Sequence, residues 1–236
     1  MNIQKLLILV FLPALVLCTS CHKRPSKVEQ MRAEKNERDS LAYIQAGQTL
    51  HYADSLLQTL MPEVEPLMKS FRYEKNESYE DHGHYVHKLL ATSSNSQRCF
   101  LQAYVSDDRQ TAVQSYFYGS AAIHQHYINL SVNDLYVEAE GQNHSFEVEG
   151  VHEILSVIGD DAINILRFIE SNQDQRIKVT AKGDREAVYY LTADEKKALS
   201  ETYQLARLMA DIAEMEHTIR LCNLRIEKYR QKHHIQ

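Results

Sequence analysis

A long uninterrupted helix at the C-terminal end constrains the fold of this chain more than any other feature. Neither glycine nor proline occurs after Thr192. Thr192 and Glu195 have the spacing of a capping box, in which the hydroxyl and the carboxylate satisfy free backbone N–H groups of the first helical turn. We therefore expect one helix from about residue 193 towards the end of the chain.

The apolar residues of this helix form a narrow stripe with steps of three and four residues, which is the spacing of a heptad repeat. This C-terminal seam consists of Leu205, Leu208, Ile212, Met215, Ile219, Cys222, Ile226 and Tyr229. So narrow a stripe fits another helix better than a sheet. The partner helix is either an N-terminal helix of the same chain or the same helix of a second copy, which would give a homodimer. Dimer seams often carry leucine where Met215, Cys222 and Tyr229 stand, which favours the intramolecular pair.

The N-terminal partner is expected within residues 39–60, followed by an interruption at Pro62 and Pro66 and an end near Met68. Its apolar residues recur at roughly helical spacing. They are Leu41, Ile44, Ala53, Leu56, Leu57 and Leu60. This helix offers a compatible apolar face for the C-terminal seam.

The middle of the chain changes to short runs rich in valine, tyrosine, phenylalanine and threonine. Two such runs in residues 99–119 flank the turn-like segment 106–109, and residues 182–184 form a second hairpin turn. Further strands are expected at residues 71–75, 84–90, 127–132, 135–138, 146–148, 176–181 and 186–191, and a helix at 160–169. The predicted fold class is α+β, an antiparallel sheet or meander with long N- and C-terminal helices packed together as a coiled-coil-like pair.

The first 21 residues have the layout of an export signal. Lys5 precedes the run Leu6–Leu17, which contains no polar side chain and is shorter than the roughly 20 apolar residues of a membrane span. Cys18 and Cys21 follow, and then a polar segment begins. An ordinary secretory signal and a short uncleaved anchor are the alternatives.

This stretch resembles the signal peptide of bacterial lipoproteins. In that family a small residue precedes the modified cysteine, as Ser20 precedes Cys21, whereas Leu17 precedes Cys18. The family usually has an aliphatic residue three positions before the cysteine, where this chain has Cys18. The resemblance implies cleavage before Cys21 and acylation of Cys21, and two or more acyl chains anchor a protein stably. In general style the chain is also similar to small lipoproteins of Bacteroidetes-type gut bacteria, a likeness that transfers no functional residue.

These boundaries give a signal peptide over residues 1–20, a polar, lipid-anchored stalk over 21–38 and a single globular domain over 39–236. The chain of 236 residues can bury a sizeable core without metals or disulfides. Its net charge of −6, without a basic stripe, disfavours nucleic acid as a partner. We expect location in the cell envelope of a bacterium, facing the periplasm or the surface.

Candidate site residues are few. His82 and His84 lie two residues apart in a predicted strand, His87 follows, and imidazoles so placed can share a metal; His124 and His126 repeat the spacing. Cys99 and Cys222 are expected as packed thiols, with a disulfide between them as the alternative. A possible ligand surface consists of Tyr116, Tyr118 and Tyr127, because aromatic side chains on a sheet can bind carbohydrate or peptide.

The sequence contains no GxSxG elbow and neither of the glycine-rich phosphate-binding patterns. We therefore expect no catalytic residue and no cofactor. The predicted function is a non-enzymatic binding or interaction module, tethered to membrane lipid through Cys21, with a protein, peptide or glycan partner. The alternatives are a metal-dependent envelope enzyme that uses the His82–His87 cluster, and a purely structural or assembly protein.

Overall fold

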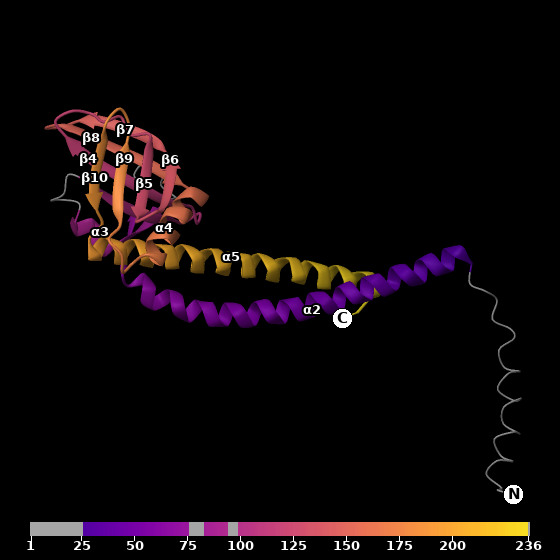
Figure 1. The fold of residues 1–236 in the computed structure, drawn as a ribbon. Helices are drawn as coiled ribbons and strands as arrows, with labels where there is room; N and C mark the ends of the chain where they lie inside the picture. Colours follow the sequence, from indigo (N-terminus) through magenta and orange to yellow (C-terminus); the bar gives the residue numbers. More distant parts are fainter. Residues whose placement is uncertain (1–25, 76–82, 94–98, 236) are drawn as a thin grey trace, which may run out of the picture. The chain divides into compact units, whose positions relative to one another are not determined.

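The computed structural model describes residues 26–75, 83–93 and 99–235 (Figure 1). The chain divides into two compact units, each described by itself. The helical unit comprises, in its described part, residues 26–50 and 221–235. The sheet unit comprises His51–Arg220. Within the described residues, no helix is both long and apolar enough to pass through a membrane.

The expected α+β class is confirmed, with antiparallel strands and a long helix at each end of the described chain. The elements in chain order are α2 (Lys27–Met68), β1 (Phe71–Lys75), β2 (Gly83–His87), α3 (Lys88–Ser93), β3 (Cys99–Ser106), β4 (Thr111–Gly119), β5 (Tyr127–Val132), β6 (Leu135–Glu140), β7 (Gln142–Glu147), β8 (Val151–Ile158), α4 (Asp160–Ser171), β9 (Lys178–Lys182), β10 (Glu186–Tyr190) and α5 (Ala193–His233). The strand expected at 84–90 is shorter than predicted, because α3 begins at Lys88.

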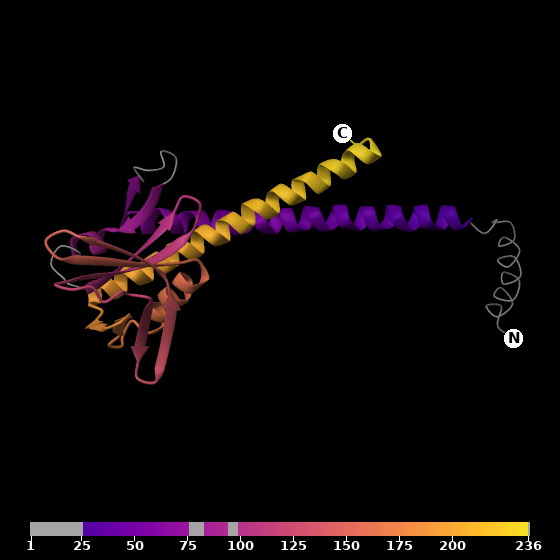
Figure 2. The same cartoon turned by 90° about the horizontal axis from the view of Figure 1, so that it is seen from above.

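The strands form two antiparallel sheets, whereas the sequence analysis expected one. The first has the order β1-β2-β3-β4-β8-β7 and the second the order β10-β9-β5-β6 (Figures 1 and 2). The predicted turn at 106–109 joins β3 to β4, and the turn at 182–184 joins β9 to β10. Strand β8, which pairs with β4 over eight residues from Val151 to Ile158, was not predicted.

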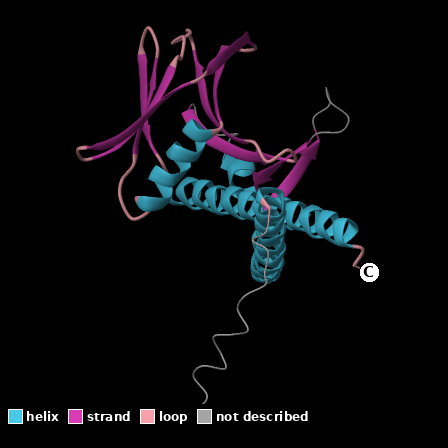
Figure 3. Ribbon diagram, turned by 90° about the vertical axis from the view of Figure 1, so that its right-hand side faces the viewer, coloured by secondary structure: helices cyan, strands magenta, loops and turns pink. Residues whose placement is uncertain are grey.

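The core of the sheet unit lies between the two sheets and the helices that cover them. Leu101, Val113 and Leu155 of the first sheet belong to the same buried cluster as Ile128 and Leu130 of the second. Helix α4 adds the fully buried Ile165, Leu166 and Ile169, and α5 adds Leu199. Figure 3 shows α4 beside the strands, where it contacts β4 and β8 of one sheet and β6 of the other. Burial of these aliphatic side chains is the main stabilising term of this unit.

Helix α5 begins as predicted. The backbone N–H of Thr192 donates to Glu195 Oε2 at 2.8 Å, and the backbone N–H of Glu195 donates to Thr192 Oγ1 at 3.2 Å. The C-terminal seam is the least exposed side of the second half of α5. Leu205, Ile212 and Cys222 are buried, and the other five members are half-buried.

Helix α2 runs without interruption to Met68, so the predicted interruption at Pro62 and Pro66 is wrong. A proline removes one backbone donor, and a long helix that is held along its length tolerates that loss at the cost of a bend. The helix also runs through residue 39, the expected start of the globular domain. It begins with a capping box that was not predicted, because Ser26 N–H donates to Glu29 Oε2 at 2.7 Å and Glu29 N–H donates to Ser26 Oγ at 3.2 Å.

The covered side of α2 agrees with the predicted one from Ala53 onward, because Ala53, Leu57 and Leu60 are buried or half-buried, but it differs from the prediction before that residue. Leu41 and Ile44 are 52% and 51% exposed. The half-buried or buried positions instead follow alternating steps of three and four residues. This α2 seam consists of Tyr43, Ala46, Leu50, Ala53, Leu57, Leu60, Val64 and Leu67. Small and aromatic residues occupy several of its positions, so the seam is not evident from hydrophobicity alone.

Helices α2 and α5 contact each other within each unit. In the helical unit, the rings of Tyr43 and Tyr229 stack with 4.5 Å between their centroids, and Lys232 forms an ion pair with Asp39. In the sheet unit, the cluster of Phe71, Val105, Leu205 and Ala206 is completed by Leu67 and Met68 at the end of α2. These contacts are local, and they do not confirm the expected coiled-coil-like packing of the two long helices.

Candidate functional site

The alternation of side chains along β3 and β4 gives the six-stranded sheet two different faces. Leu101, Ala103 and Val105 of β3 are fully buried against the core. The residues between them, Gln102 and Tyr104, point to the opposite, outer face, because successive side chains of a strand alternate. The register pairs Gln102 with Gln114 and Tyr104 with Ala112, so β4 continues the same polar and aromatic face.

The outer face is hollowed to a volume of about 520 Å³, and we call this space the outer hollow. Its lining residues come from β1 to β4, the β3–β4 turn and the end of β8. They are Arg72, Glu74, Gly83, His84, Gln102, Tyr104, Ser106, Asp108, Gln110, Ala112, Gln114, Tyr116 and Ile158. The lining is thus dominated by amides, hydroxyls and aromatic rings, with Ala112 as its buried floor.

Hydrogen bonds hold the centre of the hollow in place. The hydroxyl of Tyr116 donates to Gln114 Oε1 at 2.8 Å, and Gln114 Nε2 donates to Ser156 Oγ at 3.2 Å. Burial raises the pKa of Tyr116 to about 12, so this hydroxyl remains a donor at physiological pH. No hydrogen bond of the Gln102 amide is found among the described residues, which leaves both its donor and its acceptor available to a ligand.

One rim of the hollow carries charge. Arg72 and Glu74 form an ion pair on β1, and Glu74 Oε2 lies 3.4 Å from His84 Nε2 on β2. The His84 ring packs against the ring of Tyr104 with 4.6 Å between centroids. Burial also raises the pKa of Tyr104, which keeps this phenol neutral. Arg72 and Glu74 therefore compensate each other at this rim, Asp108 adds a carboxylate at the β3–β4 turn, and the centre of the hollow is neutral.

An aromatic strip extends the outer face towards the β7 edge. Tyr118, His152 and Phe146 are aligned across β4, β8 and β7 by the strand register. The Phe146 and His152 rings stack at 4.9 Å, and the Tyr118 and His152 rings lie 4.6 Å apart. Tyr118 and Phe146 are 37% and 47% exposed, so their rings are open to a ligand. Tyr118 is held by a hydrogen bond from its hydroxyl to the Glu149 carbonyl at 2.6 Å.

The structure separates the three tyrosines that were predicted to form one ligand surface. Tyr116 lines the outer hollow and Tyr118 lies two residues further along the same face of β4. Tyr127 begins β5, which belongs to the other sheet. The first two are therefore brought to one surface, and Tyr127 is not part of it.

The predicted metal ligands are also distributed differently. His84 lies at the outer hollow, whereas His87 is buried on the core side, with its Nε2 2.8 Å from Glu201 Oε2. His87 Nδ1 accepts a hydrogen bond from the Leu89 N–H at 3.2 Å, so Nε2 carries the proton and donates to Glu201. His82 lies outside the described residues. Within the described part of the chain, no group of three histidine, cysteine or acidic side chains is placed to hold a metal ion.

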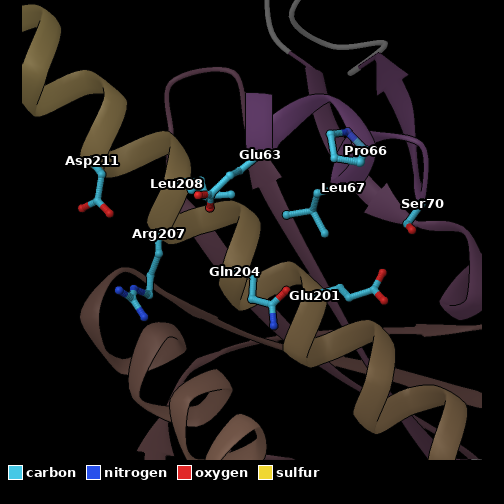
Figure 4. Close-up of a pocket in the computed structure, with 9 residues that line it drawn as sticks. All are labelled: Glu63, Pro66, Leu67, Ser70, Glu201, Gln204, Arg207, Leu208 and Asp211. Atoms are coloured by element: carbon cyan, nitrogen blue, oxygen red, sulfur yellow. The ribbon is translucent and has the colours of Figure 1, made fainter. Parts of the chain in front are cut away.

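A second hollow of about 430 Å³ lies in the sheet unit between the end of α2 and α5 (Figure 4). Its lining residues are Glu63, Pro66, Leu67, Ser70, Glu201, Gln204, Arg207, Leu208 and Asp211. Glu201 is already engaged by His87. Among the described lining residues, Glu63 and Asp211 are the other acidic side chains and Arg207 is the basic one. This groove has fewer neutral hydrogen-bonding groups than the outer hollow and no aromatic ring in its lining.

The cysteines occupy separate positions. Cys99 at the start of β3 and Cys222 on the C-terminal seam are not joined by a disulfide, so the alternative of a bond between them is not realised. Cys222 is buried and packs as a small apolar group, as expected for that seam position. Cys21, the predicted lipidation residue, lies outside the described residues.

Sequence analysis missed most residues of the outer hollow. The alternation of Leu101, Ala103 and Val105 with Gln102 and Tyr104 is the pattern of a half-buried strand and could have assigned them to one face. Arg72 and Glu74 join the hollow only through strand pairing, which a single sequence does not specify. Comparisons of the chain with protein-family models, with curated proteins and with solved structures found no match.

Proposed function

We propose that this protein is a bacterial envelope lipoprotein, tethered through Cys21, whose sheet unit binds a glycan at the outer face without catalysing a reaction. The observation that carries the binding proposal is the outer hollow, where neutral amides and phenols surround a small buried floor. Binding sites are typically concave, with a few polar groups held in place by their own hydrogen bonds. The Tyr116–Gln114–Ser156 chain provides such an arrangement.

The chemistry of the lining favours a glycan over a peptide. Each sugar hydroxyl both donates and accepts hydrogen bonds, and the side chains of Gln102, Gln110 and Gln114 offer both functions. The hollow crosses several strands on the sheet face, whereas a peptide that extends a sheet pairs along an edge strand. The exposed rings of Tyr118 and Phe146 add flat apolar surface of the kind against which the C–H face of a sugar ring can pack.

We further propose that α2 and α5 pack together through their seams as a coiled-coil-like pair. Both seams follow alternating steps of three and four residues, and both are less exposed than the other sides of their helices. The Tyr43–Tyr229 stack and the Asp39–Lys232 ion pair support pairing of the seams within one chain.

The binding proposal predicts a selective loss of affinity. The mature chain is to be screened for binding to an array of bacterial and host glycans, and the affinity of the best neutral oligosaccharide then measured by calorimetry. We expect Gln114→Ala to weaken binding by at least tenfold, because it removes one ligand-facing amide and releases the Tyr116 hydroxyl.

The matched control for this experiment is Tyr136→Ala. Tyr136 is 71% exposed on β6 of the other sheet, and its loss is expected to leave the affinity unchanged. Equal weakening by both substitutions would place the binding surface elsewhere. Binding of peptides but of no glycan would contradict the ligand class, and binding of neither would favour the purely structural role.

A further inference from the structure

Charge is divided unequally between the two units. The sheet unit contains 15 lysines and arginines against 27 aspartates and glutamates, a net charge of −12. The described residues of the helical unit contain 8 basic against 5 acidic side chains, a net charge of +3, before His233 and His234 are counted. An anionic surface therefore attracts the helical unit and repels the sheet unit.

The basic side chains of the helical unit surround a hollow of about 280 Å³ between α2 and α5. Its charged and aromatic lining consists of Asp39, Tyr43, Arg225, Lys228, Tyr229 and Lys232. The stacked rings of Tyr43 and Tyr229 belong to both helices and fix their separation at this point. The three cations are thus held around one space by the packing of the helices.

Two of the three cations are available to a ligand. Lys232 is paired with Asp39. Arg225 and Lys228 are exposed, and neither forms an ion pair within the described residues. A helix dipole favours cations only in the last turn of a helix. The dipole therefore explains the position of Lys232 in the last turn of α5, but it does not explain the position of Arg225.

We propose that this basic hollow binds the phosphate groups of anionic lipids at the membrane surface to which the chain is tethered. Arginine and lysine bind phosphate through charge-assisted hydrogen bonds, and Arg225 can present two parallel N–H groups.

The proposal relies on acylation of Cys21 for its location. Lys27 comes six residues after Cys21, which is at most about 22 Å of chain. Asp39 lies twelve residues into α2 from Lys27, about 18 Å along the helix. The hollow is therefore within about 40 Å of the lipid anchor.

The test measures binding of the mature chain carrying Cys21→Ser, which has no acyl group, to sedimented vesicles. We expect binding to vesicles of phosphatidylglycerol and phosphatidylcholine at low salt, loss of that binding at 0.5 M salt, and none to pure phosphatidylcholine. Each basic residue near an anionic surface contributes about fivefold to partitioning. The double variant Arg225→Gln, Lys228→Gln is accordingly expected to bind about 25-fold more weakly.

The control variant Lys69→Gln, Lys75→Gln removes the same charge from exposed positions of the sheet unit and is expected to bind like the unaltered chain. Equal weakening by both double variants, or no binding to anionic vesicles, would overturn the proposal. Binding of inorganic phosphate that is lost in the Arg225 and Lys228 variant, without vesicle binding, would assign the hollow to a free anion instead. Because no variant carries an acyl chain, these outcomes are independent of whether Cys21 is lipidated.

Discussion

Glu153→Ala is expected to unfold the sheet unit or to remove most of its stability. Glu153 lies on the core side of β8 and is fully buried. Its carboxylate accepts three backbone hydrogen bonds, from Ile123 at 2.7 Å, His124 at 2.9 Å and Gln125 at 2.9 Å. The alanine would leave the Ile123 and Gln125 donors buried without an acceptor, and the part-buried His124 donor would lose its partner as well.

Each orphaned buried N–H group costs about 1–3 kcal/mol, so we expect a loss of at least about 3 kcal/mol in the free energy of unfolding. The whole stability of a domain is about 5–15 kcal/mol. The loop of residues 123–125, whose N–H groups donate to Glu153, forms further contacts that require the same conformation. The Asp184 N–H donates to the Ile123 carbonyl at 2.9 Å, and a side chain on Gly183 would approach that carbonyl to 2.2 Å. Loosening the loop therefore also disturbs the β9–β10 turn.

Urea unfolding followed by circular dichroism measures this effect. Glu153→Gln keeps one acceptor oxygen and is expected to lose less stability than the alanine variant. Glu147→Ala, at an exposed position of the neighbouring strand β7, serves as the control and should change stability by less than about 0.5 kcal/mol. A Glu153→Ala protein as stable as the control would show that the carboxylate does not hold the loop.

The second large effect is expected from Ile212→Asp on the C-terminal seam. Ile212 is 9% exposed, so the substitution loses the burial of an aliphatic side chain and places a carboxylate without a partner against the seam. We expect a loss of about 3 kcal/mol in the free energy of unfolding. Ile219→Asp, at a half-buried position of the same seam, should lose less.

Ala210→Asp provides the control, because Ala210 is exposed on the same helix two residues away. It introduces the same charge and should cost less than about 1 kcal/mol. Unfolding is to be measured over a hundredfold range of protein concentration. A midpoint independent of concentration supports pairing within one chain, whereas a midpoint that rises with concentration supports the homodimer. Equal effects of Ile212→Asp and Ala210→Asp would refute the seam.

The elements with strong local patterns were predictable from the sequence. Helix α5 was found through its capping box and its seam, and the hairpin turns through Asp107, Asp108 and Gly183. Strand β8 was missed because it carries the buried Glu153 on its core side and Ile154 on its outer side, which removes the usual alternation. The interaction that explains Glu153 is with residues 123–125, and only the folded chain brings them together.

The candidate site was predictable only in part, for a similar reason. Tyr116 and Tyr118 were identified by their aromatic character, and both lie on the outer face. Tyr127 was grouped with them by proximity in sequence, but the chain passes to the other sheet before β5. The assembly of Arg72, Gln102 and Gln114 around one hollow depends on the pairing order of four strands. That order is a property of the whole fold and leaves no local signature.

We propose that the protein is tethered to a membrane through Cys21, and intact mass spectrometry of the membrane-extracted protein tests this tethering most directly. We predict a chain that begins at Cys21 and carries the added mass of acyl groups. A Cys21→Ala variant should lack that mass and leave the membrane fraction. A wild-type chain cleaved at another residue, without lipid, would contradict the claim and make the protein a freely diffusing exported factor.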